Sequence, residues 1–190
     1  MTIAAFGDSL TQGYGLPDGD GLVPQLQRWL TGKGLDVTLI NAGVSGDTTA
    51  GGLARIDWTL TPDIQAVIVE LGGNDILRGL PPQESRKNLD GILESVAEKG
   101  LPILLVGMKA PQNYGADYEV QFNAIYPDLA EKYDALLFPE YLSPILDGRT
   151  MTEALATFMQ ADGIHPDKNG VALIVEVLGP LVADLAARAN

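Results

Sequence analysis

Residues 66 to 75 read Ala-Val-Ile-Val-Glu-Leu-Gly-Gly-Asn-Asp, an almost unbroken apolar run that ends in a glycine-rich polar turn. Such a run, without alternation of polar and apolar residues, is typical of a strand covered on both faces, as in a parallel sheet. Four shorter runs have the same character, the last more weakly: Ile3–Phe6, Val37–Ile40, Ile103–Val106 and Ala135–Phe138. The sequence therefore predicts five buried strands, with Ala66–Leu71 the most strongly apolar.

Amphipathic segments separate these strands. Apolar residues recur at helical spacing in three of them, within 22–30, 89–96 and 171–185. Strands that alternate with helices form a parallel sheet with helices on both faces, and its ligands bind at the carboxyl ends of the strands. We expect a single α/β domain over residues 1–190. Trp29 and Trp58 fall on apolar helical faces and are predicted to lie in the core.

Composition narrows the possible functions. The chain has 190 residues, of which 46% are hydrophobic and 19% charged, values that fit one globular domain and exclude disorder. Lys+Arg 12 against Asp+Glu 25 gives a net charge of -13, which argues against nucleic-acid binding and docking to anionic membranes. There is no cysteine and one histidine, which excludes disulfides, thiolate sites and multi-histidine metal sites. We expect no metal and no cofactor.

The termini give expectations about membrane and location. The stretch from Val171 to Ala187 is apolar but is interrupted by Glu176, Pro180 and Asp184, so we expect no stable membrane insertion. The first six residues lack the basic region of a secretory leader. We expect a periplasmic or secreted protein if a leader has been removed and a cytoplasmic one otherwise, as a monomer or small homo-oligomer.

Three polar loops follow the first three predicted strands. Ser9, within Gly7–Gly13, could present its hydroxyl to a substrate near free backbone N–H groups, although a helix cap explains the same residues. Gly46 could bring its N–H close to a ligand, or could serve only the geometry of a turn. Asn74 could donate its amide to a negative charge, although Asn-Asp after Gly-Gly is also ordinary turn chemistry.

A fourth loop, Asp162-Gly163-Ile164-His165-Pro166, precedes the last helix. A serine nucleophile needs a base, and an imidazole whose tautomer is fixed by a carboxylate is the usual one. His165 is the only histidine, and Asp162 is close enough to reach its ring; a structural histidine remains the alternative. Asp8 and Asp75 are expected to organise their loops, and Glu70 to bond to neighbouring polar groups. No G-x-S-x-G elbow, P-loop or G-x-G-x-x-G motif is present.

Taken in order, four short motifs resemble the successive sequence blocks of the GDSL family and its SGNH hydrolases. They are Gly7-Asp8-Ser9-Leu10, Val44-Ser45-Gly46-Asp47, Gly72-Gly73-Asn74-Asp75 and Asp162-Gly163-Ile164-His165-Pro166. Leu77-Arg78-Gly79 and Asn113-Tyr114-Gly115 further resemble its bacterial branch of thioesterases, lysophospholipases and arylesterases.

The resemblance implies a flavodoxin-like α/β/α sandwich with five parallel strands that hydrolyses a small-molecule ester or thioester. It implies Ser9 as nucleophile, His165 as base and Asp162 as its orienting acid. The oxyanion hole would consist of the N–H groups of Ser9 and Gly46 and the amide of Asn74. We further expect substrate contacts from these residues: Asp8, Ile76, Leu77, Ala110, Pro111 and Ile164.

Two alternatives stay open at the level of sequence. A carbohydrate O-deacetylase of the same fold would prefer acetylated sugar to longer acyl esters. A flavodoxin-like binding protein would use the Ser9–Gly13 loop as a phosphate cradle and would be yellow or would bind FMN.

Overall fold

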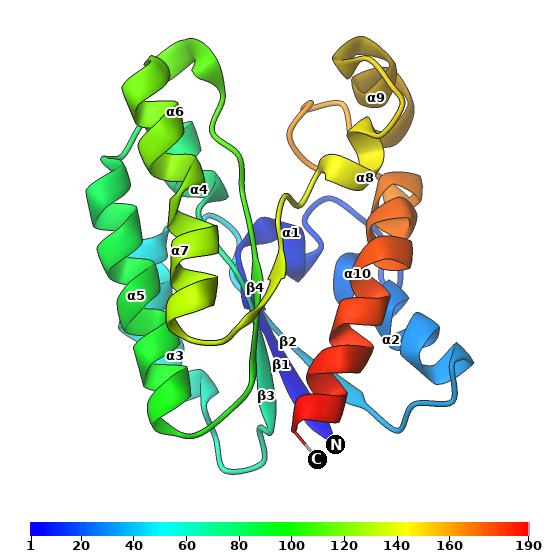
Figure 1. Ribbon diagram of the computed structural model, residues 1–190. Helices are drawn as coiled ribbons and strands as arrows, with labels where there is room; N and C mark the ends of the chain where they lie inside the picture. The colour runs from blue at the N-terminus through cyan, green and yellow to red at the C-terminus, as the bar shows by residue number, and fades with distance from the viewer. Residues whose placement is uncertain (190) are drawn as a thin grey trace.

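The computed structural model describes residues 1–189, and its centre is a five-stranded parallel sheet in the order β2-β1-β3-β4-β5 (Figure 1). The five strands are β1 (Thr2–Gly7), β2 (Thr38–Gly43), β3 (Ala66–Glu70), β4 (Ile103–Val106) and β5 (Leu136–Phe138). All neighbouring pairs are parallel. The predicted fold class is confirmed.

The register brings the carboxyl ends of the strands to one edge. Gly7, the last residue of β1, pairs with Gly43 of β2 and with Glu70 of β3, and Glu70 pairs in turn with Val106 of β4. The chain moves outward from β1 to β2 and then returns to the other side of β1 as β3. In parallel sheets the crevice beside such a reversal is where ligands bind. The loops after β1 and β3 flank it.

Helices cover both faces of the sheet (Figure 1). On one face lie α3 (Thr49–Thr59), α5 (Pro82–Glu98) and α7 (Ile125–Lys132), and on the other lie α2 (Leu22–Gly32) and α10 (Lys168–Arg188). Shorter elements cluster beyond the carboxyl edge of the sheet. They are α1 (Ser9–Gln12), α4 (Gly73–Leu77), η1 (Gln112–Tyr114), α6 (Ala116–Asn123), α8 (Ser143–Leu146) and α9 (Met151–Phe158).

The last helix, α10, is long and apolar enough to cross a membrane by length and composition. It is also a core helix, since Ile174, Leu178, Val182 and Leu185 are fully buried. Its Gly179 lies against the ring of Trp29 on α2, where a Cβ atom would come within 2.6 Å of the indole. The apolar face of α10 is therefore used in packing against the sheet and α2.

Two expectations about burial are wrong. β2 begins at Thr38 rather than Val37 and is an edge strand, in which Ile40 is 42% exposed. Trp58 lies on α3 but is 86% exposed, whereas Trp29 is partly buried against the core as expected. By contrast, the last five residues of β1 and all residues of β3 and β4 are buried, as their apolar runs predict.

Candidate active site

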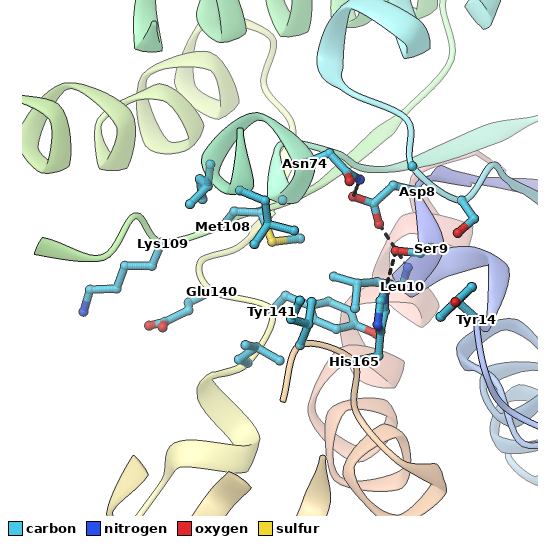
Figure 2. A pocket seen from close by; sticks show the side chains of 17 residues that line it. Asp8, Ser9, Leu10, Tyr14, Asn74, Met108, Lys109, Glu140, Tyr141 and His165 are labelled. Carbon is cyan, nitrogen blue, oxygen red and sulfur yellow. Dashed lines mark hydrogen bonds between the residues drawn. The ribbon is translucent and has the colours of Figure 1, made fainter. Parts of the chain in front are cut away.

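Ser9 stands at the first turn beyond β1 and lines a pocket at the carboxyl edge of the sheet (Figure 2). Asp8 caps the short helix α1, since its Oδ1 accepts a hydrogen bond from the N–H of Leu10 at 3.0 Å. The Ser9 side chain is thereby held on a fixed backbone with little exposure. The helix cap, given above as the alternative explanation of this motif, is provided by Asp8, while the neighbouring Ser9 lines the pocket.

His165 and Asp162 complete a hydrogen-bonded series with Ser9. His165 Nε2 lies 2.8 Å from Ser9 Oγ, and His165 Nδ1 lies 2.6 Å from Asp162 Oδ2. The second oxygen of Asp162 accepts the backbone N–H groups of Ile164 at 2.9 Å and His165 at 3.0 Å. Partial burial would raise the pKa of Asp162, but hydrogen bonds from these N–H groups and from the imidazole outweigh it and lower this pKa to about 2. Asp162 therefore carries a negative charge beside the imidazole at neutral pH.

The loop that carries His165 is anchored next to the nucleophile. The N–H of Gln160 donates to the carbonyl of His165 at 2.8 Å, and the Gln160 side chain donates to the carbonyls of Tyr14 at 2.8 Å and Pro166 at 3.1 Å. The rings of Tyr14 and His165 are 4.9 Å apart. One glutamine thus joins the C-terminal loop to the segment that follows Ser9.

Two residues that line the pocket have backbone N–H groups free to bind a ligand. The N–H groups of Ser9 and Gly46 donate to no acceptor within residues 1–189, and both residues line the pocket. Gly46 has a φ of +85°, a conformation that favours glycine, and its carbonyl accepts from Arg78 Nη2 at 2.8 Å. These are the donors that the sequence motifs predict for an oxyanion.

Asn74 also lines the pocket, but both hydrogens of its amide are engaged within the protein. Its Nδ2 donates to Asp8 Oδ2 at 3.1 Å (Figure 2). The same nitrogen donates to the carbonyl of Asp47 at 2.9 Å. Gly72 precedes it with a φ of +121°, which turns the chain sharply after β3 and brings Asn74 to the pocket. Asn74 can therefore serve an incoming oxyanion only by giving up one of its present acceptors.

Asp8 and Asp75, the acids that adjoin Ser9 and Asn74, are buried. Asp75 accepts hydrogen bonds from the N–H of Thr49 at 2.8 Å and the hydroxyls of Thr49 at 2.6 Å and Ser85 at 3.0 Å. Its expected function of organising loops is confirmed. Burial raises the pKa of Asp8 to about 6, against the opposing hydrogen bonds from Leu10 and Asn74 and the charge of His165. In residues 1–189 no group of three or more His, Asp or Glu side chains could hold a metal ion.

The pocket has a volume of about 390 Å³ and extends away from Ser9 between the loops that follow β1, β3, β4 and β5. Of the predicted substrate contacts, four line it: Asp8, Ile76, Leu77 and Ile164. Its apolar surface also comes from residues that were not predicted: Leu10, Tyr14, Met108, Tyr141 and Leu142.

Ala110 and Pro111 do not line the pocket, contrary to expectation. The chain after β4 turns so that Met108 and Lys109 face the pocket, while Ala110 is buried and its N–H donates to Asn123 Oδ1 at 2.9 Å. Tyr141 and Leu142 directly follow β5, so the rule that ligands bind at the carboxyl ends of parallel strands could have identified them. The orientation of Lys109 could not be read from the sequence.

Comparison with known proteins agrees with this geometry. The family model described as the GDSL-like lipase/acylhydrolase family matches residues 5–173. Esterase TesA of Pseudomonas aeruginosa is 36% identical over 186 residues, covering 97% of this chain and 89% of that protein. Thioesterase 1/protease 1/lysophospholipase L1 of Escherichia coli K12 is 35% identical over 178 residues, covering 92% of this chain and 80% of that protein.

Solved structures give the same result. The crystal structure of AlinE4, an esterase of the SGNH-hydrolase family, superposes with a TM-score of 0.78 at 49% identity, covering 96% of this chain and 95% of that one. The match to the family model includes all four motif loops, from Ser9 to His165. The chain belongs to the GDSL-like lipase/acylhydrolase family.

Proposed function

We propose that the protein is a serine ester hydrolase in which Ser9 is the nucleophile, His165 the general base and Asp162 the residue that orients the imidazole. The observation that carries this proposal is the pair of short contacts on the two ring nitrogens of His165, 2.8 Å to Ser9 Oγ and 2.6 Å to Asp162 Oδ2. A nucleophile within hydrogen-bond distance of a base that is itself held by a third group is the arrangement that acyl transfer requires.

The reaction follows from these contacts. His165 accepts the proton of Ser9 Oγ as the oxygen attacks the acyl carbonyl, and Asp162 stabilises the imidazolium that forms. The imidazolium then protonates the leaving alcohol or thiol, which departs and leaves an acyl group on Ser9. Water enters, gives its proton to His165 and releases the acid, which restores Ser9.

The negative oxygen of the tetrahedral intermediate would be stabilised by the N–H groups of Ser9 and Gly46 and by the amide of Asn74. The two N–H groups have no competing acceptor in residues 1–189. Asn74 joins them by exchanging its bond to Asp8, the longer of its two, for one to the oxyanion. Donors of this kind contribute most where charge develops in the transition state.

The pocket supports an apolar acyl group. Leu10, Ile76, Leu77, Met108 and Leu142 line it, and most of the exposed pocket surface is apolar, which suits an acyl chain better than the hydroxyls of a sugar. The names of the relatives, esterase, arylesterase, thioesterase and lysophospholipase, suggest that thioesters and lysophospholipids are accepted as well as simple esters.

A substrate panel tests this proposal. Purified protein is assayed with p-nitrophenyl esters from acetate upward, with acyl-CoA and lysophospholipid, and with an acetylated sugar, each in parallel with Ser9→Ala. We expect hydrolysis that is lost in the variant and improves from acetate to longer acyl groups. A preference for the acetylated sugar over butyryl and octanoyl esters would identify a deacetylase instead, and no hydrolysis of any ester would refute the proposal.

A further inference from the structure

Two buried acids lie side by side beneath the candidate nucleophile, and only one of them belongs to the motif that carries it. Asp8 and Glu70 are each 1% exposed. They meet because Gly7, which precedes Asp8, pairs with Glu70 in the register of β1 and β3. The mechanism above gives Glu70 no function.

The surroundings of Glu70 favour a proton on this pair of acids. Glu70 Oε2 accepts the hydroxyl of Thr11 at 2.7 Å, while Oε1 has no donor within residues 1–189. A hydrogen bond between the side chains of Glu70 and Asp8 contributes to lowering the pKa of Asp8. Two carboxylates are both acceptors, so a bond between them forms only when one is protonated.

The surroundings place that proton on Glu70. Burial first, and then the negative charge of Asp8, raise the pKa of Glu70 well above its usual value, and the hydrogen bonds from Thr11 and from the N–H of Asp8 only partly oppose them. Other ionisable groups do not reverse this. Burial also raises the pKa values of Tyr126 on α7 and Tyr141 after β5 well above the ordinary value, so both phenols stay neutral.

The positively charged side chains near this pair interact with other groups. The charge of His165 acts on Asp8 and lowers its pKa. Arg55 of α3 donates to the carbonyl of Gly7 at 2.9 Å, but its guanidinium pairs with Asp47 at 2.6 Å. The pair of Glu70 and Asp8 thus has no cation of its own within residues 1–189 and carries one negative charge and one proton near neutral pH.

We propose that Glu70 is a positioning residue for the oxyanion hole: its neutral carboxyl donates a hydrogen bond to Asp8, so that Asp8 can release the amide of Asn74 to the substrate. The proposal rests on the proposed function, because it assigns Glu70 a function in that reaction. It also explains how Asn74 can act on a substrate although its amide donates to Asp8 Oδ2 in this structure (Figure 2).

Without this donor, moving the Asn74 amide from Asp8 to the oxyanion would cost free energy. When Asn74 turns to the oxyanion, Asp8 keeps the N–H of Leu10 but loses the amide as a donor, and a buried carboxylate that loses a donor is destabilised. The proton of Glu70 can move along the hydrogen bond to Asp8 at that moment. The O–H bond of Glu70 breaks as that of Asp8 forms, and the total charge of the pair stays at minus one. The negative charge then lies on Glu70, beside Thr11 and away from the oxyanion.

Three variants separate this function from a structural one. Glu70→Gln keeps a donor of the same size but holds no titratable proton, and Glu70→Leu removes the donor. Thr11→Val removes the hydroxyl that favours ionised Glu70. Glu98→Gln makes the same chemical change as the first variant on an exposed residue of α5 and is the matched control.

The first readout is the pH profile of kcat for a p-nitrophenyl ester. Wild type is expected to lose activity at alkaline pH, as the pair loses its last proton and two negative charges face the oxyanion. Glu70→Gln should keep kcat within about fivefold at neutral pH and lack this alkaline loss, since the amide replaces the donor. Thr11→Val should move the loss to higher pH, and Glu98→Gln should behave as wild type. Glu70→Leu should lower kcat by about tenfold or more with KM within about threefold.

The second readout does not depend on activity. An infrared difference spectrum of wild type against Glu70→Gln at neutral pH should contain the C=O band of a protonated carboxyl group, which Glu98→Gln should leave in place. An alkaline loss that is unchanged in Glu70→Gln, or absent from an active wild type, overturns the proposal, and so does a spectrum without the band. A wild type inactive on every ester refutes the proposed function instead, and the spectrum still tests the proton on Glu70.

Discussion

The amide of Asn74 donates to Asp8 Oδ2 at 3.1 Å, so the acid that precedes the candidate nucleophile occupies a donor of the proposed oxyanion hole. Asp8 is therefore more than a helix cap. It holds Asn74 at the pocket in the absence of a charge to bind, and it stands where a substrate oxyanion must compete with it.

Replacing the nucleophile gives the first prediction. Ser9→Ala should reduce kcat/KM for p-nitrophenyl esters by about 10³-fold or more, since nucleophile and base act as a unit. The fold should persist, because within residues 1–189 the hydroxyl forms a hydrogen bond only with the imidazole of His165. Circular dichroism and a thermal melt serve as the control. Activity close to that of wild type would rule out Ser9 as the nucleophile.

The second prediction concerns the two oxygens of Asp162, which have different functions. Asp162→Asn can keep the oxygen that accepts the N–H groups of Ile164 and His165, but it places an NH₂ group against His165 Nδ1. The loop should stay folded while the imidazole takes the wrong tautomer, and kcat should fall by about 10²- to 10⁴-fold. Asp162→Ala is the comparison, since it should lose the loop contacts too. Full kcat in the Asn variant would show that another group orients His165.

Removal of the side-chain donor gives a third prediction. Asn74→Ala should lower kcat by about 10²- to 10³-fold with a smaller change in KM, because the amide acts on the oxyanion rather than on the ground state. Steady-state kinetics on a single p-nitrophenyl ester separates the two constants. A change confined to KM would instead assign Asn74 to substrate binding.

Gly46 gives a fourth prediction that depends on backbone geometry alone. A Cβ atom on Gly46 would meet nothing closer than Arg78 at 4.0 Å, so Gly46→Ala suffers only from its φ of +85°. The strain should lower the free energy of unfolding by about 1–2 kcal/mol. If the loop relaxes to relieve it, the N–H turns away and kcat falls, which denaturation and kinetics on the same sample would reveal together.

The fifth prediction is the pH dependence of stability. The pKa of Asp8, raised to about 6, means that the folded protein holds more protons than the unfolded chain between about pH 4 and 6. The contribution of Asp8 to the free energy of unfolding is therefore full below this range and is lost as pH rises through it. Urea denaturation at several pH values should show that Asp8→Asn reduces this loss.

Asp162 acts in the opposite direction. Its lowered pKa contributes stability above about pH 4, and this contribution disappears as pH falls toward 2. Asp162→Asn should therefore leave the slope between pH 4 and 6 in place and alter only the acid side. If Asp8→Asn had the same slope between pH 4 and 6 as wild type, Asp8 would have an ordinary pKa in the folded protein.

The sequence predicts the central strands well because their environment is uniform. β3 and β4 are covered on both faces, so continuous apolar runs are enough to locate them. β2 is different because it lies at the edge, and its position depends on which strand pairs with β1 rather than on its own residues. The exposure of Trp58 on α3 has the same origin, since a helix at the edge of the sheet has less of its surface covered.

The same distinction applies to the site. The motif loops could be placed at one edge of the sheet because parallel strands end there together. The proximity of Asp8 to Glu70 could not be predicted in this way, because it depends on the register that pairs Gly7 with Glu70. The hydrogen bonds from Asn74 to Asp8 and Asp47 could not be predicted either, because they depend on the turn at Gly72. The path of the chain after β4 likewise decides that Lys109 and not Ala110 faces the pocket.

The candidate nucleophile and its base are 156 residues apart in the chain and meet only across the carboxyl edge of the sheet. A nascent chain that ends between Asn74 and Asp162 contains Ser9, Gly46 and Asn74 but has neither the proposed acid nor the proposed base. The proposed hydrolysis can therefore begin only after the ribosome has passed His165. A protease cut that releases the segment from Gln160 onward would silence the enzyme while leaving its nucleophile chemically intact.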